Sequence, residues 1–400
     1  MTEENKSVKN FPNLRFPGFE GQWSKTTLES LGNIITGSTP ATHETTFYNG
    51  NRLFVSPADL QSNRYVFKTK TTLTEKGFNK GRKIRRGSTY FVCIGSTIGK
   101  VGQATEDSIT NQQINSVIPF DNDDDFVFSL LEYSSFRIKS LSAEQAVPII
   151  NKTTFSNIIV AIPNIEEQKK ISSLFKLLDE RIQTQKKIIE DLQVTKKEIS
   201  FKLFKEGFNS SESKKENLQK LGDLTYIVNK KNKENLKLPV YSINNKKGFI
   251  SQSEQFEGID SDERGYDISL YKIIEKETFA YNPARINVGS IGYSRNLENI
   301  IISSLYVCFK TIDEVDDEFL FQYLRTDIFR KEVLRNVEGG VRDYLFYENF
   351  SRIKINLPDL KEQIKINKLL FKFDEKITLE NELLTQYENQ KKYLLQNLFV

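Results

Sequence analysis

The sequence predicts an α+β protein in which a mixed α/β domain followed by a long helix occurs twice. The two helices are expected to pair antiparallel, as a coiled coil, about an internal pseudo-two-fold axis. Three observations lead to this prediction: a gapless internal repeat, an apolar heptad pattern within both copies of it, and β-rich segments before each copy. With 400 residues, the chain is also long enough for two or more domains.

The internal repeat organises the chain. Residues 162–204 align without a gap on residues 357–399, at an offset of 195 residues, with 13 identities in 43 positions. The identical pairs include Pro163 and Pro358, Gln168 and Gln363, Asp179 and Asp374, Glu180 and Glu375, and Phe204 and Phe399. Chance does not produce such a match without gaps, so the sequence contains two copies of one unit.

Each copy of the repeat has a helical seam. Apolar residues recur at alternating steps of four and three, which is typical of a coiled-coil helix. The seam residues are Ile171, Phe175, Leu178, Ile182, Ile189, Leu192, Ile199 and Leu203, and Ile366, Leu370, Phe373, Ile377, Leu384, Tyr387, Leu394 and Leu398. A helix of about 40 residues, roughly 60 Å long, cannot bury this stripe on itself. We therefore expect the two helices to pair, with ordinary helices of a larger bundle as the alternative.

Two matched seam positions are polar in both copies, namely Gln185 with Glu380 and Lys196 with Lys391. Polar residues at such positions fix the register and the partner of a helix pair at some cost in stability. We expect these side chains to set how the two helices align.

The rest of the chain divides around these helices. We expect domain 1 at residues 1–160, helix 1 at 161–207, a Ser-, Glu- and Lys-rich linker at 208–217, domain 2 at 218–355 and helix 2 at 356–400. Both domains carry the same succession of an early Leu-Gly pair, a glycine-rich turn and a strand. In domain 1 these are Leu31-Gly32, residues 94–100 and 115–119, and in domain 2 Leu221-Gly222, residues 288–293 and 300–309.

Composition excludes several classes of protein. No apolar run has the length of a membrane span and the first ten residues lack a secretory signal's apolar core, so we expect a cytoplasmic protein. Cys93, Cys308 and the single histidine, His43, are too few for a zinc site or a disulfide framework. There is no G-x-G motif, and Ala284 and Arg285 break the resemblance of residues 282–285 to a methyltransferase Asn-Pro-Pro-aromatic loop. The sequence thus predicts no catalytic, metal or cofactor site.

Polar clusters next to the glycine turns suggest DNA contact instead. Residues 63–100 hold ten Lys or Arg against one acidic residue, although the net charge of the chain is only +4. Cations suit phosphates and guanine, whereas Asn and Gln suit adenine. The candidates are Arg82, Lys83, Arg85, Arg86, Thr97, Lys100, Asn111, Gln112, Gln113 and Asn115, and Lys246, Lys247, Tyr281, Asn282, Arg285, Asn287, Tyr293, Ser294 and Arg295. For any single one of them, a turn-stabilising or solvated role is the alternative.

The arrangement resembles the specificity subunit of type I restriction-modification systems. The resemblance is carried by the opening segment 13–23, by the Pro-to-Glu-Gln helix starts at 162–168 and 357–363, and by the Asn-Gln-Gln-Ile-Asn segment 111–115. It implies two target recognition domains, each recognising one half of a bipartite double-stranded DNA site, separated by the helices. It also implies a non-catalytic chain on which two modification (methyltransferase) subunits and the restriction (endonuclease and translocase) subunits assemble. A coiled-coil scaffold whose domains bind other proteins is the alternative.

Overall fold

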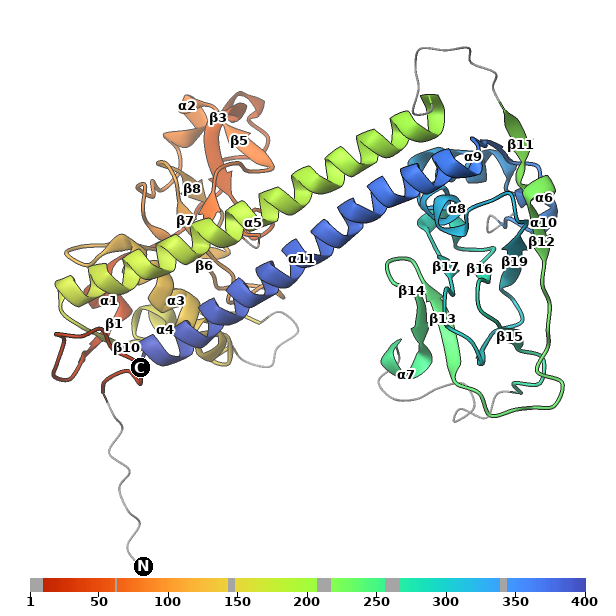
Figure 1. Ribbon diagram of the computed structural model, residues 1–400. Helices are drawn as coiled ribbons and strands as arrows, with labels where there is room; N and C mark the ends of the chain where they lie inside the picture. The colour runs from red at the N-terminus through yellow and green to blue at the C-terminus, as the bar shows by residue number, and fades with distance from the viewer. Residues whose placement is uncertain (1–9, 62, 143–147, 207–216, 256–266, 339–343) are drawn as a thin grey trace, which may run out of the picture. The chain divides into compact units, whose positions relative to one another are not determined.

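The computed structural model describes residues 10–400 except residue 62 and the segments 143–147, 207–216, 256–266 and 339–343 (Figure 1). The chain forms two compact units, unit 1 from Met1–Ile188 and Glu380–Val400, and unit 2 from Ile189–Leu379. The predicted linker at 208–217 lies outside the described residues except for Asn217.

Unit 1 holds two sheets and a strand pair. The five-stranded sheet has the order β2 (Gly32–Thr36), β9 (Ile114–Pro119), β6 (Thr89–Val92), β7 (Val101–Ala104) and β4 (Tyr65–Val66). The three-stranded sheet has the order β5 (Thr71–Leu73), β3 (Tyr48–Val55) and β8 (Ile109–Thr110), and β1 (Ser24–Thr27) pairs with β10 (Ile159–Ile162). The short helices are α1 (Leu28–Leu31), η1 (Thr45–Phe47), α2 (Glu75–Phe78), α3 (Asp124–Lys139) and α4 (Lys152–Ser156).

Unit 2 is built in the same way. One four-stranded sheet has the order β12 (Thr225–Ile227), β19 (Val307–Thr311), β16 (Phe279–Tyr281) and β17 (Ile291–Tyr293). The other has the order β14 (Gly248–Ser251), β13 (Val240–Asn244), β18 (Ile300–Ile302) and β15 (Lys272–Ile274), and β11 (Leu218–Lys220) pairs with β20 (Lys354–Asn356). The helices are α6 (Leu221–Leu224), α7 (Gln252–Gln255), η2 (Ile286–Val288), α8 (Asp317–Leu324), α9 (Asp327–Asn336) and α10 (Tyr347–Phe350).

The predicted fold class, a mixed α/β plan present twice, is confirmed. The antiparallel order β2-β9-β6-β7 of unit 1 recurs as β12-β19-β16-β17 in unit 2, and each second sheet contains one parallel pair, β3 with β8 and β13 with β18. In both units a strand pair, β1 with β10 or β11 with β20, leads directly into a long helix.

Two details of the predicted plan are wrong. The segment 300–309 is not one strand, because a turn at 303–306 divides it into β18 and β19, which belong to different sheets. The two Leu-Gly pairs are not equivalent either: Leu31 ends the short helix α1, whereas Leu221 begins α6. A continuous apolar run and a dipeptide do not by themselves show where a chain changes sheet.

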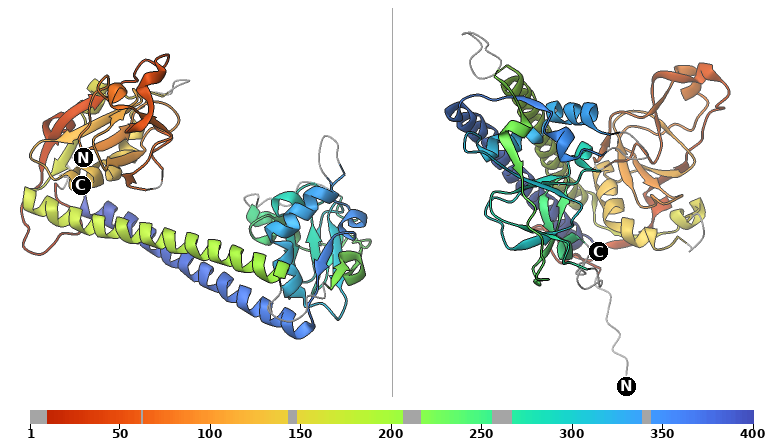
Figure 2. Two further views of the ribbon diagram at one scale, coloured as in Figure 1. Left: turned by 90° about the horizontal axis from the view of Figure 1, so that it is seen from above. Right: turned by 90° about the vertical axis from the view of Figure 1, so that its right-hand side faces the viewer.

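The long helices are α5 (Ile165–Glu206, 42 residues) and α11 (Leu360–Leu398, 39 residues), and each contributes one half to unit 1 and the other to unit 2. In unit 1 the pairing is antiparallel, as Figures 1 and 2 show, with Arg181 Nε donating to the Tyr387 hydroxyl at 2.9 Å. The Gln185 side chain meets Glu380, and its Nε2 donates to the Glu380 carbonyl oxygen at 3.0 Å. The predicted seam residues are all buried or half-buried, which confirms the heptad assignment.

The repeated Leu-Phe ends of the helices complete the cores. Phe399 packs in the core of unit 1 with Trp23, the only tryptophan of the chain, and its repeat equivalent Phe204 packs against Phe319 and Tyr323 in unit 2. Each unit therefore takes core residues from both copies of the repeat.

The Glu-Gln helix starts also have matched roles. The Gln168 Oε1 accepts the backbone N–H of Asp123, the N-cap of α3, at 3.1 Å. In unit 2 the Gln363 Oε1 accepts that of Asp316, the N-cap of α8, at 2.8 Å. Both glutamine side chains are nearly fully buried. Because buried amides must be hydrogen-bonded, each glutamine fixes a long helix to the first turn of a domain helix.

Candidate nucleic-acid interface

The loop that leads into β6 carries four cations of the basic segment 63–100, namely Arg82, Lys83, Arg85 and Arg86. Arg82 Nη1 donates to the Thr36 carbonyl oxygen at 2.8 Å, and Lys83 Nζ lies 5.1 Å from the ring centre of Phe78. Both basic side chains are exposed. These contacts hold the stems of the side chains against the domain while the charged groups stay at the surface.

The next two arginines differ from each other. Arg85 donates to both carboxylate oxygens of Asp124, at 2.6 and 2.7 Å, and to the Pro119 carbonyl oxygen at 3.0 Å. Its charge is thus balanced at the start of α3. Arg86 is exposed, and its hydrogen bonds are made by its backbone: the N–H donates to Asp107 at 2.9 Å and the carbonyl oxygen accepts from Arg85 at 2.8 Å. Of the pair, Arg86 is the more available for an external anion.

The glycine turn at 94–100 and the amide-rich segment at 111–115 lie next to each other in unit 1. Their separation in the sequence does not by itself require this contact. Gln113 Nε2 donates to the Ile94 carbonyl oxygen at 3.4 Å, and Asn111 Nδ2 donates to Gln113 Oε1 at 3.0 Å. Gly95 has a φ of +94°, a backbone conformation that side-chain-bearing residues rarely adopt. In the same region Gln112 is exposed and accepts a hydrogen bond from Thr39.

The remaining unit 1 candidates divide by exposure. Lys100 is exposed and Thr97 is half-buried. Asn115 is only 3% exposed: its Oδ1 accepts from the Thr36 hydroxyl at 2.7 Å, and its Nδ2 contacts Cys93 Sγ at 3.2 Å. A side chain enclosed in this way supports β9 from within, so its position is that of a core residue.

The turn with Lys246 and Lys247 and the glycine turn at 288–293 meet in unit 2. The carboxamide of Asn244 accepts the backbone N–H groups of Lys246 and Lys247, at 2.8 and 3.2 Å, which fixes the β13–β14 turn. A Cβ placed on Gly289, whose φ is +89°, would lie 3.7 Å from the Asn245 carbonyl oxygen. The lysine turn and the glycine turn are therefore in close approach.

The Asn-Pro segment of unit 2 is a turn. Asn282 Oδ1 accepts the backbone N–H of Ala284 at 3.0 Å, and the Arg285 carbonyl oxygen accepts that of Ser290 at 3.1 Å. Arg285 is exposed and Asn287 is half-buried. The amide of Asn282 is thus used to hold the turn, while the Arg285 guanidinium remains at the surface.

Burial removes two unit 2 candidates from the surface. Tyr281 is fully buried, with its ring 5.5 Å from that of Phe350, and burial raises the pKa of its hydroxyl. Ser294 is 5% exposed and its hydroxyl both donates to the Glu275 carbonyl oxygen and accepts the Thr278 N–H, each at 2.9 Å. These two residues are structural in this conformation.

Tyr293 and Arg295 are tied to the start of α8. The Tyr293 hydroxyl donates to Asp317 at 2.7 Å, and its half-buried ring stacks on Phe279 at a centroid distance of 4.5 Å. Arg295 pairs with Glu318 through two nitrogens, one of them at 2.9 Å, and is exposed. Arg295 is therefore held in one orientation at the surface.

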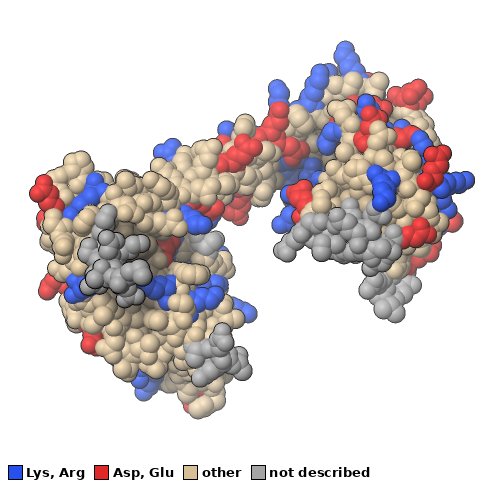
Figure 3. Space-filling view, turned by 90° about the horizontal axis from the view of Figure 1, so that it is seen from below, with Lys and Arg blue, Asp and Glu red and all other residues tan. Residues whose placement is uncertain are grey.

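The surface does not carry one sign of charge. In the view of Figure 3, Lys and Arg side chains lie among Asp and Glu side chains on unit 2. The charge therefore differs from one cluster of side chains to the next. Two cations that the sequence analysis missed, Arg325 and Arg330, lie where α8 gives way to α9, beside the turns that contain Lys246 and Gly289. In the sequence they resemble an ordinary solvated helix face.

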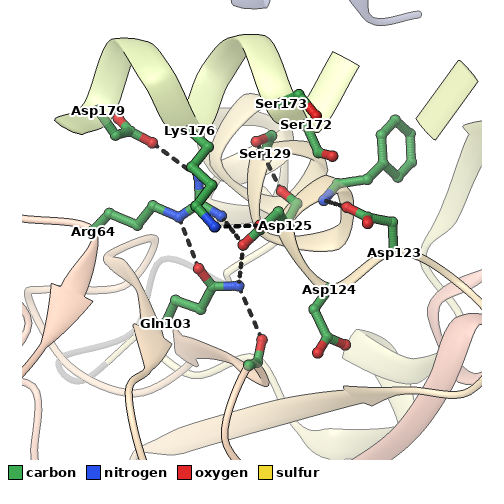
Figure 4. Close-up of polar contacts among 12 residues, drawn as sticks. Arg64, Gln103, Asp123, Asp124, Asp125, Ser129, Ser172, Ser173, Lys176 and Asp179 are labelled. Carbon is green, nitrogen blue, oxygen red and sulfur yellow. Dashed lines mark hydrogen bonds and ion pairs between the residues drawn. The ribbon is translucent and has the colours of Figure 1, made fainter. Parts of the chain in front are cut away.

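One cation of the basic segment is buried instead. Arg64 is 7% exposed and, as Figure 4 shows, donates to Gln103 at 2.8 Å, to Asp179 of α5 at 3.1 Å and to Asp125 of α3. Lys176 of α5 lies 3.7 Å from Asp125. The basic segment therefore supplies one fewer surface cation than its sequence indicates, and Arg64 joins the domain to the long helix.

The matched polar seam positions form crossed ion pairs. In unit 1, Lys391 of α11 lies 2.6 Å from Asp179 of α5 and 2.7 Å from Glu132. In unit 2 the repeat equivalents have exchanged helices, with Lys196 of α5 lying 2.6 Å from Asp374 of α11. Burial raises the pKa of Glu132, although Lys391 acts against this. Burial also opposes the charge of Lys391, but the two carboxylates outweigh it and raise the pKa of the lysine.

Within the described parts of the chain, no group of three or more His, Cys, Asp or Glu residues is placed to hold a metal ion. No helix in those parts combines the length and the apolar character that crossing a bilayer demands.

Two copies of one mixed α/β plan, each completed by both long helices, define a duplicated two-unit protein. The family model described as the type I restriction modification DNA specificity domain matches residues 20–194 and again residues 212–389, once for each copy. The chain therefore belongs to this family, that of the type I restriction-modification specificity subunits.

Individual relatives agree. The type I restriction enzyme MjaIX specificity subunit of Methanocaldococcus jannaschii is 23% identical over 391 residues, which cover 89% of this chain and 87% of that protein. The HindI specificity subunit of Haemophilus influenzae is 32% identical over 163 residues, covering 38% of this chain and 35% of its own length.

Solved structures share the fold. The type I restriction-modification S subunit from M. genitalium is similar with a TM-score of 0.62 and 18% identity, over 98% of this chain and 99% of that one. A chain from a structural study of the assembly and conformational transition of the type I restriction-modification system has a TM-score of 0.55 and 15% identity, covering 96% of this chain and 97% of its own.

Proposed function

We propose that this protein is the subunit that gives a type I restriction-modification complex its DNA sequence specificity, and that it recognises a bipartite double-stranded target. One target recognition domain lies within residues 1–160 and the other within 218–355, and each recognises one half of the site. The surface side chains near the glycine turns, among them Arg82, Arg86 and Gln112 in the first domain and Arg285 in the second, are the proposed contacts. Asn115, Tyr281 and Ser294 are left out because they are buried.

The crossed ion pairs are the observation that supports this proposal most. The pair Asp179 with Lys391 and the pair Asp374 with Lys196 use the same two repeat positions with the helices exchanged. Each unit therefore holds α5 and α11 together in a defined register. Since both helices run without a break from one unit into the other, they can serve as a stiff spacer between the domains. Joining two weak binding sites through such a spacer raises the effective concentration of the second and selects the distance between half-sites.

The chemistry is proposed to reside in other subunits. Two modification subunits would dock on this chain and carry the methyltransferase reaction, and the restriction subunits would join them to cut and translocate DNA. The chain itself then needs no cofactor, and its part is to place the partners on the correct sequence.

The test is methylome sequencing of a host that expresses this chain with its partner subunits. We expect a two-part methylated motif with a fixed gap. Binding to duplex DNA should fall steeply with salt, because phosphate contacts release counterions. A motif in one continuous block, or association that is insensitive to salt and to duplex sequence, would count against the proposal and favour the protein-binding scaffold.

A second experiment tests the spacer. Inserting seven residues between 188 and 189 and seven between 379 and 380 lengthens both helices by about 10 Å at 1.5 Å per residue. At about 3.4 Å per base pair, the required gap should change by about three base pairs while both half-sites stay the same. The matched control carries the insertion in α5 alone, which puts the crossed pairs out of register and should reduce stability. An unchanged gap in the double insertion would refute the spacer.

A further inference from the structure

A basic pocket in unit 2 is not accounted for by base recognition. It has a volume of about 300 Å³ and lies between the β13–β14 turn, the turn after η2, and the junction of α8 and α9. Its cationic lining residues are Lys246, Lys247, Arg295, Arg325 and Arg330, and none of its described lining residues is acidic. We call it the basic pocket.

The positive charge of the basic pocket is only partly balanced. Arg295 is paired with Glu318, Lys247 with Glu254 at 2.6 Å, and Arg330 with Asp327 at 3.0 Å. Lys246 and Arg325 have no ion pair among the residues that the structure describes, and both are exposed. Five cations against three carboxylates leave an excess of two positive charges at the pocket.

The cationic groups are also held in position. The guanidinium carbons of Arg325 and Arg295 lie 5.4 and 5.3 Å from the ring centre of Phe321, one ring shared by two arginines. Phe321 is 7% exposed, so it is a fixed platform. The turn that carries Lys246 is fixed by the Asn244 carboxamide. Stacked guanidinium groups are weakly hydrated and present a rigid fork of donors, which suits a phosphate group.

A pocket of unit 1 has balanced charge instead. It has a volume of about 250 Å³ and is lined by three cations, Arg64, Lys186 and Lys391, and by three carboxylates, Glu132, Asp179 and Glu388. These groups pair with one another: Lys186 with Glu388 at 3.1 Å, and Lys391 with Glu132 and Asp179. A pocket whose charges are balanced does not attract an external anion, whereas the excess positive charge of the basic pocket does.

We propose that the basic pocket binds one phosphate of the DNA backbone, with Arg325 and Lys246 as its main ligands, and that it does so without regard to base sequence. This inference rests on the proposed function, and it adds Arg325 to Lys246, which the polar clusters already included, as two ligands of a single phosphate. Phosphate contacts fix the position of a protein on the duplex but carry no sequence information directly. The basic pocket thus orients unit 2 so that the neighbouring turns reach the bases.

The test uses the full chain with target and non-target duplexes over a range of salt concentrations. The variants are Arg325→Ala and Lys246→Ala, and the matched control is Lys354→Ala, an exposed lysine of β20 that does not line the pocket. Loss of a charge-assisted hydrogen bond should weaken binding about 10- to 100-fold. The loss should be equal for both duplexes, and the slope of log affinity against log salt should fall by about one. Lys354→Ala should change neither.

The outcomes separate the pocket from the proposed function. If the unaltered chain distinguishes target from non-target duplex but both pocket variants keep its affinity and salt slope, the pocket inference is overturned and the function stands. A loss confined to one base sequence would also overturn it, because it would mean base contact. If the unaltered chain distinguishes no duplex, the proposed function itself fails. Should Arg325→Ala not fold, Lys246→Ala, in an exposed turn, decides the question.

Discussion

Replacing Phe399 with alanine removes a ring that lies 5.3 to 6.1 Å, centre to centre, from the rings of Trp23, Phe126, Tyr133 and Phe175. Phe399 is 3% exposed, so the change leaves a cavity in the core of unit 1. Truncation of a buried phenylalanine costs about 3–5 kcal/mol. With a urea dependence of about 2.5 kcal/mol per M, a loss of about 4 kcal/mol lowers the unfolding midpoint by about 1.5 M.

Trp23 makes this change measurable in unit 1 alone. It is the only tryptophan in the chain and lies in the same core, so its fluorescence reports the unfolding of that core. The control is Tyr393→Ala on the same helix, where the side chain is 56% exposed and the cost should stay within about 0.5 kcal/mol. Phe204→Ala makes the equivalent cavity in unit 2 and should shift the Trp23 transition less than Phe399→Ala. If Phe399→Ala and Tyr393→Ala give the same midpoint, the reasoning is refuted.

Three further predictions concern charge, recognition and reactivity. Lys391→Met should destabilise the chain by about 3 kcal/mol at pH 8, because Glu132 keeps a partly buried charge without its cation. Burial raises the pKa of Glu132 in the folded chain, so ionisation of this carboxyl destabilises the fold as pH rises. In urea unfolding, the loss of stability caused by Lys391→Met should therefore be smaller at pH 5 than at pH 8. An equal loss at both pH values would contradict this. Gln112→Ala should relax discrimination at one position of one half-site by about 1–3 kcal/mol, measured by competition between duplexes, whereas a uniform loss would indicate a phosphate contact. Burial raises the pKa of Cys93 to about 12 and that of Cys308 to about 11. At pH 8 iodoacetamide should therefore alkylate both thiols only after unfolding, which mass spectrometry would detect. Rapid labelling of the native chain would contradict this prediction.

The helices were predictable from the sequence because their information is local and repeated. A heptad seam sustained over about 40 residues leaves few other structures, and an offset of 195 residues identifies the partner of each seam position. For the same reason the polar seam residues Lys196 and Lys391 could be expected to contact the opposite helix, although their acidic partners could not be named.

The candidate site was less predictable because exposure depends on tertiary contacts. Arg64 has the sequence surroundings of a surface cation, yet Asp125 and Asp179, far apart in the chain, converge on it. Tyr281 and Ser294 flank a polar turn in the sequence, but both are buried. Tyr281 packs against Phe350, and the Ser294 hydroxyl is bonded to the backbone of Glu275 and Thr278. Arg325 and Arg330 became candidates only because their helices meet the Lys246 turn in space.

The core of unit 1 is built from two stretches that protein synthesis separates in time. Residues 10–188 emerge first, whereas residues 380–400, which bring Leu398 and Phe399 to that core, follow about 190 residues later. At about 5–20 residues per second, this delay lasts about 10 to 40 seconds on the ribosome. Unit 2 is one continuous stretch and can close its core first, although it comes second in the chain. Meanwhile the apolar surface around Trp23 and Phe175 stays open to water, so the yield of native protein should depend on chaperones and on the rate of translation across residues 189–379.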